Sequence, residues 1–397
     1  MRTAPRLPLA TPAAVEVLTR ILTQGPIARV EIARRTGLSQ AAVTKAVAPL
    51  VEAGYVVDSP GSREDTVIGR PVSPLAVVAE SVAAIGIKVT PSELIGVVTD
   101  LQANIQTVLH KPLAEKSPES VLDQLAILVD ELLGGGEQGT HNPLVAGSST
   151  LAGVGVAVSG DVDAVAGVVR HSAFMGWRDL PLAALLTERI GLPVVVSNDV
   201  RALTVAEHWF GVGVNANSFA IVTIGSGVGC GLYLNGDVVA GAHGVAGEIG
   251  HLPLAPDNLV CTCGRHGCVE TVASSDAILA RVREDTGRAD LDLAGAVDLA
   301  HAGDELARAA FDRAGQVIGS ALAAMVNLVG PELVVIAGEG VADYDLYDHR
   351  IRSAFAEHAF GAAADCELTI RSHTFDDWAR GAAAAVIRSF VRTEPPF

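Results

Sequence analysis

The chain has 397 residues, of which 49% are hydrophobic and only 18% are charged, and its formal net charge is -17. A composition this apolar excludes a disordered chain, and the length suffices for two or three domains. The acidic excess argues against a surface that coats nucleic acid throughout, because Lys and Arg drive phosphate binding. The charge is unevenly divided, however: residues 1–50 carry seven basic and two acidic side chains, and the other 347 residues carry a net -22. This asymmetry indicates a basic module attached to an acidic body.

The sequence predicts neither a secretory signal nor a membrane span. Prolines and Glu16 interrupt any apolar run near the N-terminus. The apolar stretch 321–338 is broken by Asn327, Pro331 and Glu332, and it falls short of the roughly 20 residues that a spanning helix needs. We therefore expect a cytoplasmic protein without a membrane partner. Three of the five cysteines lie within eight residues, which in such a chain indicates metal binding before disulfide bonding.

Residues 30–36 and 40–53 have the apolar spacing of two helices, joined by a turn that contains Gly37. Ser39 is a natural N-cap for the second helix. Two helices joined in this way form a helix-turn-helix, whose second helix enters the major groove. Pro49 removes an amide donor late in that helix, which favours a kink. The first helix is expected to turn Ile32 and Ala33 inward, and the second to bury Val43, Val47, Leu50 and Val51.

The exposed start of the second helix is expected to contact DNA. Gln reads adenine edges, small side chains allow close approach, and Lys neutralises phosphate. Residues 55–57 and 69–76 then predict a β-hairpin wing with Arg70 at its tip, against phosphate or the minor groove. An ordinary helical hairpin with a solvated basic face is the alternative, and the local charge and the wing favour DNA binding. The predicted DNA contacts are Ser39, Gln40, Ala41, Thr44, Lys45 and Arg70.

From Ser81 the pattern changes to strands and helices of an α/β body. The glycine-rich run 225–231 follows a strand, so its amides could approach a phosphate closely, although a plain turn between strands explains it equally well. Residues 134–149 are rich in Gly and Ser and predict an exposed insertion. A helix is expected over 120–133, and strands over 83–89, 93–99, 154–158, 194–197 and 219–224.

One histidine and three cysteines in C-x-C-x4-C spacing form the ligand set of a closed tetrahedral zinc site. Gly264 and Gly267 supply turns that bring the sulfurs together, and His266 competes with His251 as the nitrogen ligand. Four protein ligands leave no position for water, so the zinc is expected to be structural. The predicted ligands are His251, Cys261, Cys263 and Cys268.

Polar residues near this motif and after the strand 194–197 could hold a polyol. The C-terminal ends of strands in open α/β sheets are common ligand sites, and a polyol needs several acceptors and donors in a small pocket. Each carboxylate taken singly is more often a solvated surface residue. The candidates are Asn198, Asp199, Glu248, His251 and Glu270.

These motifs together resemble the ROK family of repressors, open reading frames and sugar kinases, and the regulators resembling the xylose repressor above all. The resemblance rests on Glu248-Ile-Gly-His251 with the cysteine motif up to Glu270, and on Asn198-Asp199, Gly225–Gly229, Asn327–Pro331 and Ala337–Gly340. It implies a winged helix-turn-helix followed by a two-lobed actin/hexokinase-like (ribonuclease H-like) fold. The implied domains are 1–78, a first lobe over 79–197 completed by a helix at 380–397, and a second lobe over 198–379. The implied sugar contacts are Gly160, Asn198, Asp199, Glu248, His251 and Glu270.

Two departures from the family pattern favour a regulator over a kinase. Family kinases have Asp-x-Gly-Gly-Thr at the first phosphate loop, where this chain has Lys88-Val-Thr-Pro-Ser92. Phosphoryl transfer depends on positioning and charge stabilisation, so no kinase activity and no ATP or Mg²⁺ cofactor are expected. Phe174 stands where family kinases have a sugar-contacting Asn. The resemblance makes Asp199 the catalytic base only if the protein is a kinase.

The sequence thus predicts a sugar-responsive transcriptional repressor, with the sugar or sugar derivative bound between the two lobes. It is expected to bind a palindromic operator as a homodimer or homotetramer, because helix-turn-helix proteins match DNA symmetry with their own. The alternatives are an ATP-dependent sugar kinase with an attached DNA-binding domain, and a regulator that responds to a protein partner.

Overall fold

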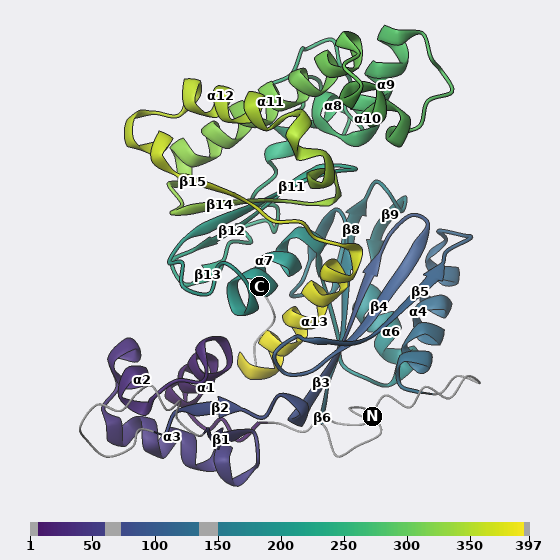
Figure 1. Ribbon diagram of the computed structural model, residues 1–397. Coiled ribbons are helices and arrows are strands. Elements are labelled where there is room, and N and C mark those ends of the chain that lie inside the picture. The colour runs from purple at the N-terminus through teal and green to yellow at the C-terminus, as the bar shows by residue number, and fades with distance from the viewer. Residues whose placement is uncertain (1–6, 60–72, 135–149, 393–397) are drawn as a thin grey trace. The chain divides into compact units, whose positions relative to one another are not determined.

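The computed structural model describes residues 7–59, 73–134 and 150–392 (Figure 1). The chain forms two compact units. Unit 1 comprises Met1–Asn215 and Asp376–Phe397, and unit 2 comprises Ala216–Phe375. Residues 198–215, which the sequence assigned to the second lobe, cluster with unit 1, as does most of the C-terminal helix. None of the described helices is long and apolar enough to cross a membrane.

Unit 1 begins with a winged helix. Its helices are α1 (Pro12–Gln24), α2 (Arg29–Thr36) and α3 (Gln40–Glu52), followed by the antiparallel strands β1 (Val56–Asp58) and β2 (Leu75–Val77). Ser39 caps α3 by accepting a hydrogen bond from the Ala42 amide, as its position in the sequence predicted. The predicted hairpin is confirmed at its base, whereas its tip with Arg70 lies outside the described residues.

The buried stripe of α3 is narrower than predicted. Val43, Val47 and Leu50 are buried, but Val51 is 39% exposed, so its assignment to the core was wrong. Leu50 and Val51 are neighbours on a 3.6-residue turn, and the small core of the winged helix accommodates only the first. Pro49 is exposed and lies inside α3, which continues past it to Glu52.

The body of unit 1 is built on a five-stranded sheet of order β10-β6-β3-β4-β5. Strands β3, β4 and β5 form an antiparallel meander, and β6 and β10 add in parallel beside β3. The bounds are β3 (Val82–Val89), β4 (Glu93–Thr99), β5 (Ile105–Pro112), α4 (Pro118–Leu132), β6 (Thr150–Val158), α6 (Leu182–Ile190), β10 (Val194–Asn198) and α7 (Asp199–Phe210). A small sheet is formed by β7 (Asp161–Asp163), β8 (Val168–Ser172) and β9 (Trp177–Leu180).

Unit 2 repeats the topology of this sheet in the order β13-β12-β11-β14-β15. Here β11, β12 and β13 form the antiparallel meander, and β14 and β15 add in parallel beside β11. This duplicated order is the one expected of the ribonuclease H-like fold. The bounds are β11 (Phe219–Ile224), β12 (Val228–Leu234), β13 (Asp237–Val238), α8 (Glu270–Ala273), α9 (Ser275–Thr286), α10 (Leu293–His301), α11 (Glu305–Val329), β14 (Leu333–Ala337), α12 (Asp348–His358) and β15 (Glu367–Ile370).

The C-terminal helix α13 (Phe375–Arg392) packs directly on the sheet of unit 1. A Cβ atom on Gly86 of β3 would lie 2.0 Å from the carbonyl oxygen of Ala379, and one on Gly155 of β6 would lie 2.1 Å from that of Ala382. The absence of side chains at these two positions therefore permits the close approach of the alanine-rich helix.

The strands and the helix predicted for the body are confirmed, with bounds that differ by a few residues. The hairpin predicted around 90–92 is the β3–β4 pair, and the predicted strand 219–224 is β11. The predicted helix 120–133 is α4, which begins two residues earlier at Pro118. The predicted insertion 134–149 lies outside the described residues from position 135 onward.

Candidate functional site

The exposed face of α3 presents the residues predicted to contact DNA. Ser39, Gln40, Ala41, Thr44 and Lys45 are all exposed, and Val43 and Val47 on the opposite side hold the helix in the domain core. The Thr44 hydroxyl donates a hydrogen bond to the Gln40 carbonyl at 2.9 Å, so it is partly occupied within the helix. The amide of Gln40 and the ammonium of Lys45 are the longest groups on this face.

Internal ion pairs neutralise much of the positive charge counted in residues 1–50. Glu31 accepts hydrogen bonds from Arg34 and Arg35 at 2.5 to 2.8 Å, and these guanidinium groups hold the pKa of Glu31 down at about 2. Arg20 pairs with Glu16 on α1, and Arg29 pairs with Asp58 on β1. Among the described basic residues of this segment, Lys45 alone has no ion pair, which makes it the strongest candidate for a phosphate contact.

Unit 1 gathers three of the predicted sugar contacts where β10 ends and α7 begins. Asn198 accepts a hydrogen bond from the Arg201 amide, and its side-chain amide donates to the Gly160 carbonyl at 3.0 Å. Gly160 has a φ of +124°, and a Cβ there would lie 2.3 Å from the His171 carbonyl oxygen, so this turn requires glycine. Asp199 is the next residue and is 6% exposed.

The Asp199 carboxylate is engaged by three donors. The ammonium of Lys88, at the end of β3, forms a buried ion pair with it, the Ser159 hydroxyl donates to it at 2.5 Å, and the Val200 amide donates at 2.9 Å. Burial alone would raise the pKa of Asp199, but the charge and hydrogen bond of Lys88 and the hydrogen bond of Ser159 outweigh it and lower the pKa. Lys88 is itself 5% exposed, and its ammonium lies 5.2 Å from the centre of the Trp378 ring. Asp199 is therefore a carboxylate whose charge is balanced within the protein.

The turn after β3, at residues 90–92, is closed by its own threonine. The Thr90 hydroxyl oxygen accepts hydrogen bonds from the amides of Ser92 and Glu93 and donates to the Glu93 carbonyl. Pro91 has no amide proton. The donors of this turn are thus occupied locally.

Unit 2 gathers the other predicted sugar contacts around a single imidazole. The Nε2 atom of His251 lies 3.9 Å from a Glu248 oxygen, and its Nδ1 atom lies 3.9 Å from a Glu270 oxygen. The other Glu270 oxygen accepts a hydrogen bond from the Val228 amide at 2.9 Å, which fixes that side chain. Glu248 remains exposed, so this unit offers carboxylate acceptors beside a histidine.

The four predicted zinc ligands also converge in unit 2. The ligand atoms of His251, Cys261, Cys263 and Cys268 all lie within 4.8 Å of one another. The Cys261 sulfur lies 3.7 Å from His251 Nδ1, and the sulfurs of Cys263 and Cys268 are 3.8 Å apart. A tetrahedron with Zn–S bonds of about 2.3 Å has edges of about 3.8 Å, so the cluster has the size of a zinc site. His266 instead faces the Asp257 carbonyl at 3.0 Å and is not part of this cluster.

The glycine-rich turn between β11 and β12 is occupied by an internal carboxylate. The Ser226 amide and hydroxyl donate to Glu339 at 2.7 Å and 3.0 Å. A Cβ on Gly225 would lie 2.1 Å from the Glu339 carboxyl carbon, so glycine is needed for this approach. In the duplicated topology this turn and the turn after β3 are equivalent. A side-chain carboxylate therefore sits where such a turn could hold a phosphate.

Sequence reasoning missed the partners that complete these arrangements. Lys88 was recognised as a departure from the phosphate loop but not as the cation that pairs with Asp199, and neither Ser159 nor Glu339 was singled out. Phe174 is 43% exposed, and its carbonyl accepts a hydrogen bond from Lys116 at 3.3 Å.

The family comparison matches both parts of the chain. The sequence model of the ROK family matches residues 85–389, and that of the MarR family matches residues 11–63. The xylose repressor of Bacillus spizizenii is 27% identical over 376 residues, which cover 94% of each chain. The glucokinase of Halalkalibacterium halodurans is 34% identical over 232 residues, 55% of this chain and 70% of its own.

A solved structure supports the fold of the whole chain. It is described as a ROK family transcriptional regulator and homolog of the E. coli MLC protein, and it matches with a TM-score of 0.78 at 24% identity, covering 95% of both chains. The relatives that span nearly the full length therefore carry the N-terminal domain as well as the body.

Proposed function

Since the chain belongs to the ROK family, we propose that it is a sugar-responsive transcriptional repressor that binds operator DNA through α3. The observation that carries this proposal is the exposed face of Gln40, Ala41, Thr44 and Lys45 on a winged helix joined to a ROK body. A repressor that reads a palindromic site acts as a dimer or a pair of dimers in the cytoplasm. The effector is a sugar or sugar derivative whose hydroxyls bond to Gly160, Asn198, Asp199, Glu248, His251 and Glu270.

Genomic binding-site mapping of the full chain tests this function. It is performed with and without D-glucose, D-xylose and N-acetylglucosamine, and we expect discrete sites whose occupancy falls with one sugar. A parallel thermal-shift screen measures the sugar directly, because a ligand at 100 times its Kd stabilises by about 2.7 kcal/mol. Discrete operators combined with no response to any sugar would favour a regulator controlled by a protein partner. The absence of discrete sites would contradict the repressor proposal altogether.

We further propose that the His251 and cysteine cluster binds a structural zinc ion. The donor set of one imidazole and three thiolates is typical of closed tetrahedral sites, and the distances between donor atoms support that geometry. Zinc would tie the loop that carries the cysteines to His251 and so hold this imidazole between Glu248 and Glu270. Metal analysis of the purified chain should give one zinc per chain.

We propose that the protein does not transfer phosphoryl groups. Lys88 neutralises Asp199, the family's base, and Glu339 engages the Ser226 amide of the glycine-rich turn. A phosphate group at that turn would be repelled by the negative charge of Glu339. We therefore expect no thermal shift with a non-hydrolysable ATP analogue, and a shift to emerge only in Glu339→Ala if the turn can still accept phosphate.

A sugar kinase remains the second candidate, because a glucokinase is 34% identical to part of the body. A coupled assay for ADP release over hexoses, pentoses and amino sugars separates the two functions. Turnover above about 1 per second, typical of working enzymes, would establish the kinase instead.

A further inference from the structure

Helix α7 connects the effector residues of unit 1 with the winged helix. Its first residue is Asp199, and Asn198 caps it. Ten of its twelve residues are buried, so solvent reaches little of its length. At about 1.5 Å per residue, the helix spans roughly 18 Å from the Asp199 end to Phe210. A helix that is buried along most of its length moves as a unit, because close-packed interiors transmit displacement.

The N-terminal end of α7 is held by polar contacts that an effector would disturb. Asp199 bonds to Lys88 and Ser159, and Asn198 bonds to the Gly160 carbonyl. A sugar hydroxyl that bonded to Asp199 would compete with these internal donors. Occupancy of the site thereby acts on the position of the first turn of α7.

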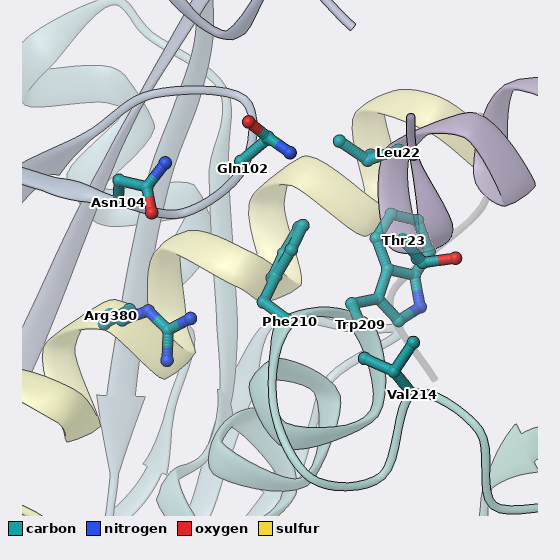
Figure 2. A pocket seen from close by; sticks show the side chains of 9 residues that line it. Leu22, Thr23, Gln102, Asn104, Trp209, Phe210, Val214 and Arg380 are labelled. Carbon is teal, nitrogen blue, oxygen red and sulfur yellow. The ribbon is translucent and has the colours of Figure 1, made fainter. Parts of the chain in front are cut away.

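The C-terminal end of α7 meets the DNA-binding domain. Trp209 and Phe210 line a pocket together with Leu22 and Thr23 near the end of α1, as Figure 2 shows. The remaining lining residues include Gln102 and Asn104 from the turn between β4 and β5. Trp209 and Leu22 are buried, whereas Phe210 is half-buried.

This junction is not close-packed. The pocket holds about 230 Å³, which is the volume of several water molecules. Arg380 of α13 lines the other side of the pocket, and its Nε donates a hydrogen bond to the Ala103 carbonyl at 2.8 Å. Side chains around such a pocket can adopt more than one packing arrangement, and these arrangements differ little in energy. The tight contact of α13 with the sheet does not allow this.

We propose that α7 transmits the state of the effector residues to the winged helix, and that Phe210 is the contact through which it acts on α1. This inference rests on the proposed function, because it names the route by which a bound sugar would alter operator binding. Trp209 anchors the end of the helix, and the half-buried Phe210 ring shifts within the pocket against the end of α1. In this proposal, a change in the packing of α7 couples the effector residues to the winged helix.

The test is a double-mutant cycle on the full chain, read by hydrogen exchange of the amides at the end of α1, with neither sugar nor DNA present. Asp199→Asn perturbs the first end of α7, and Phe210→Ala removes the ring that lines the pocket with Leu22 and Thr23 of α1 at the other end. Val212→Ala is the matched control, because this exposed valine follows α7 without lining the pocket. Exchange in α4, which does not line the pocket, corrects for a general loss of stability.

We expect Asp199→Asn to accelerate exchange at residues 21–25 about threefold or more relative to α4, as local opening responds to the altered helix. The acceleration should persist with Val212→Ala and disappear with Phe210→Ala. Equal acceleration in the presence and absence of Phe210, or none in any background, overturns the inference. If Asp199→Asn does not fold, Ser159→Ala weakens the same end and is tested in the same cycle.

Failure of this inference is distinguishable from failure of the proposed function. Operator binding and its response to sugar are measured on the unsubstituted protein, whereas the exchange cycle requires neither ligand. A protein whose operator affinity responds to sugar but whose cycle shows no coupling retains its function and loses this route. A protein that shows coupling in the cycle but no response of operator binding to sugar would retain this route and contradict the proposed effector.

Discussion

Replacing Lys88 with methionine isolates the energetic role of the buried ion pair with Asp199. Methionine has a similar length and no charge, so Lys88→Met removes the ammonium and preserves most of the packing. Asp199 keeps its hydrogen bonds from Ser159 and the Val200 amide but loses its balancing charge. Removing one partner of a buried pair costs about 3–5 kcal/mol of stability.

Protonation of Asp199 sets an upper limit on this cost. An unsupported buried carboxylate takes up a proton, and protonating a carboxyl with an ordinary pKa near 3.9 costs about 4 kcal/mol at pH 7. We therefore expect a loss of about 3–4 kcal/mol at neutral pH. The loss should shrink by about 1.4 kcal/mol for each pH unit towards pH 4, because the pKa of Asp199 in the folded variant lies above its unfolded value.

In the unsubstituted protein, the pKa of Asp199 is shifted in the opposite direction. The pKa of Asp199 lies below its ordinary value in the folded state, so its contribution to stability is complete above about pH 4 and is lost as the pH falls through the folded-state pKa. The two proteins should therefore converge in stability as the solution is acidified from neutral pH.

Thermal unfolding followed by tryptophan fluorescence measures the difference. At about 2–4 °C per kcal/mol for a domain of this size, Lys88→Met should lower Tm by roughly 6–16 °C at pH 7. Lys88→Met with Asp199→Asn should recover much of this loss, because neither charge remains buried. Lys111→Met, which breaks the more exposed pair with Glu131, is the matched control and should cost below about 1 kcal/mol. A Tm for Lys88→Met within the error of the control, or a double variant no more stable than the single one, would refute the reasoning.

Three further predictions concern other parts of the chain. Cys263→Ser should abolish zinc in elemental analysis and lower the Tm of unit 2, and unchanged zinc content would contradict the assigned ligand set. Lys45→Ala should weaken operator binding across sequences and reduce the slope of log affinity against log salt concentration by about 1, as measured by fluorescence anisotropy. Arg34→Ala should weaken binding less, because Glu31 pairs with Arg34. Equal losses would argue against the phosphate contact of Lys45. Burial, with a contribution from nearby arginines, lowers the pKa of His208 to about 3, so its stabilising effect is full above pH 6.5 and declines by about 1.4 kcal/mol per unit below it. His208→Gln should therefore flatten the acid limb of stability between pH 6 and 4, and a slope equal to that of the unsubstituted protein would exclude this role.

Local patterns predicted the helices and strands and the convergence of His251 with the three cysteines. Ser39 caps α3 as the sequence predicted, because an N-cap depends only on four consecutive residues. The cysteine spacing predicted that Cys261, Cys263 and Cys268 come together, since the turns at Gly264 and Gly267 are encoded between them. His251 lies ten residues before Cys261, and the same short separation made it recognisable.

Partners distant in the sequence could not be read from it. Lys88 and Asp199 are 111 residues apart, and Ser226 and Glu339 are 113 apart, so only the sheet topology brings each pair together. The pairing of Glu31 with Arg34 and Arg35 differs, because spacings of three and four residues on a helix make it predictable. That rule changes no net charge, because Glu31 is already counted, but it identifies Arg34 and Arg35 as cations that share an internal partner.

The position of α13 has a consequence for the order in which the chain folds during synthesis. Unit 2 is one continuous segment, Ala216–Phe375, and its residues all leave the ribosome before α13 does. The sheet of unit 1 emerges first, yet the face around Gly86 and Gly155 stays uncovered until α13 is made. Domains generally fold as units during translation, so unit 1 must wait for α13, which follows unit 2 in the sequence. A nascent or truncated polypeptide thus carries a DNA-binding domain without a completed lobe to control it.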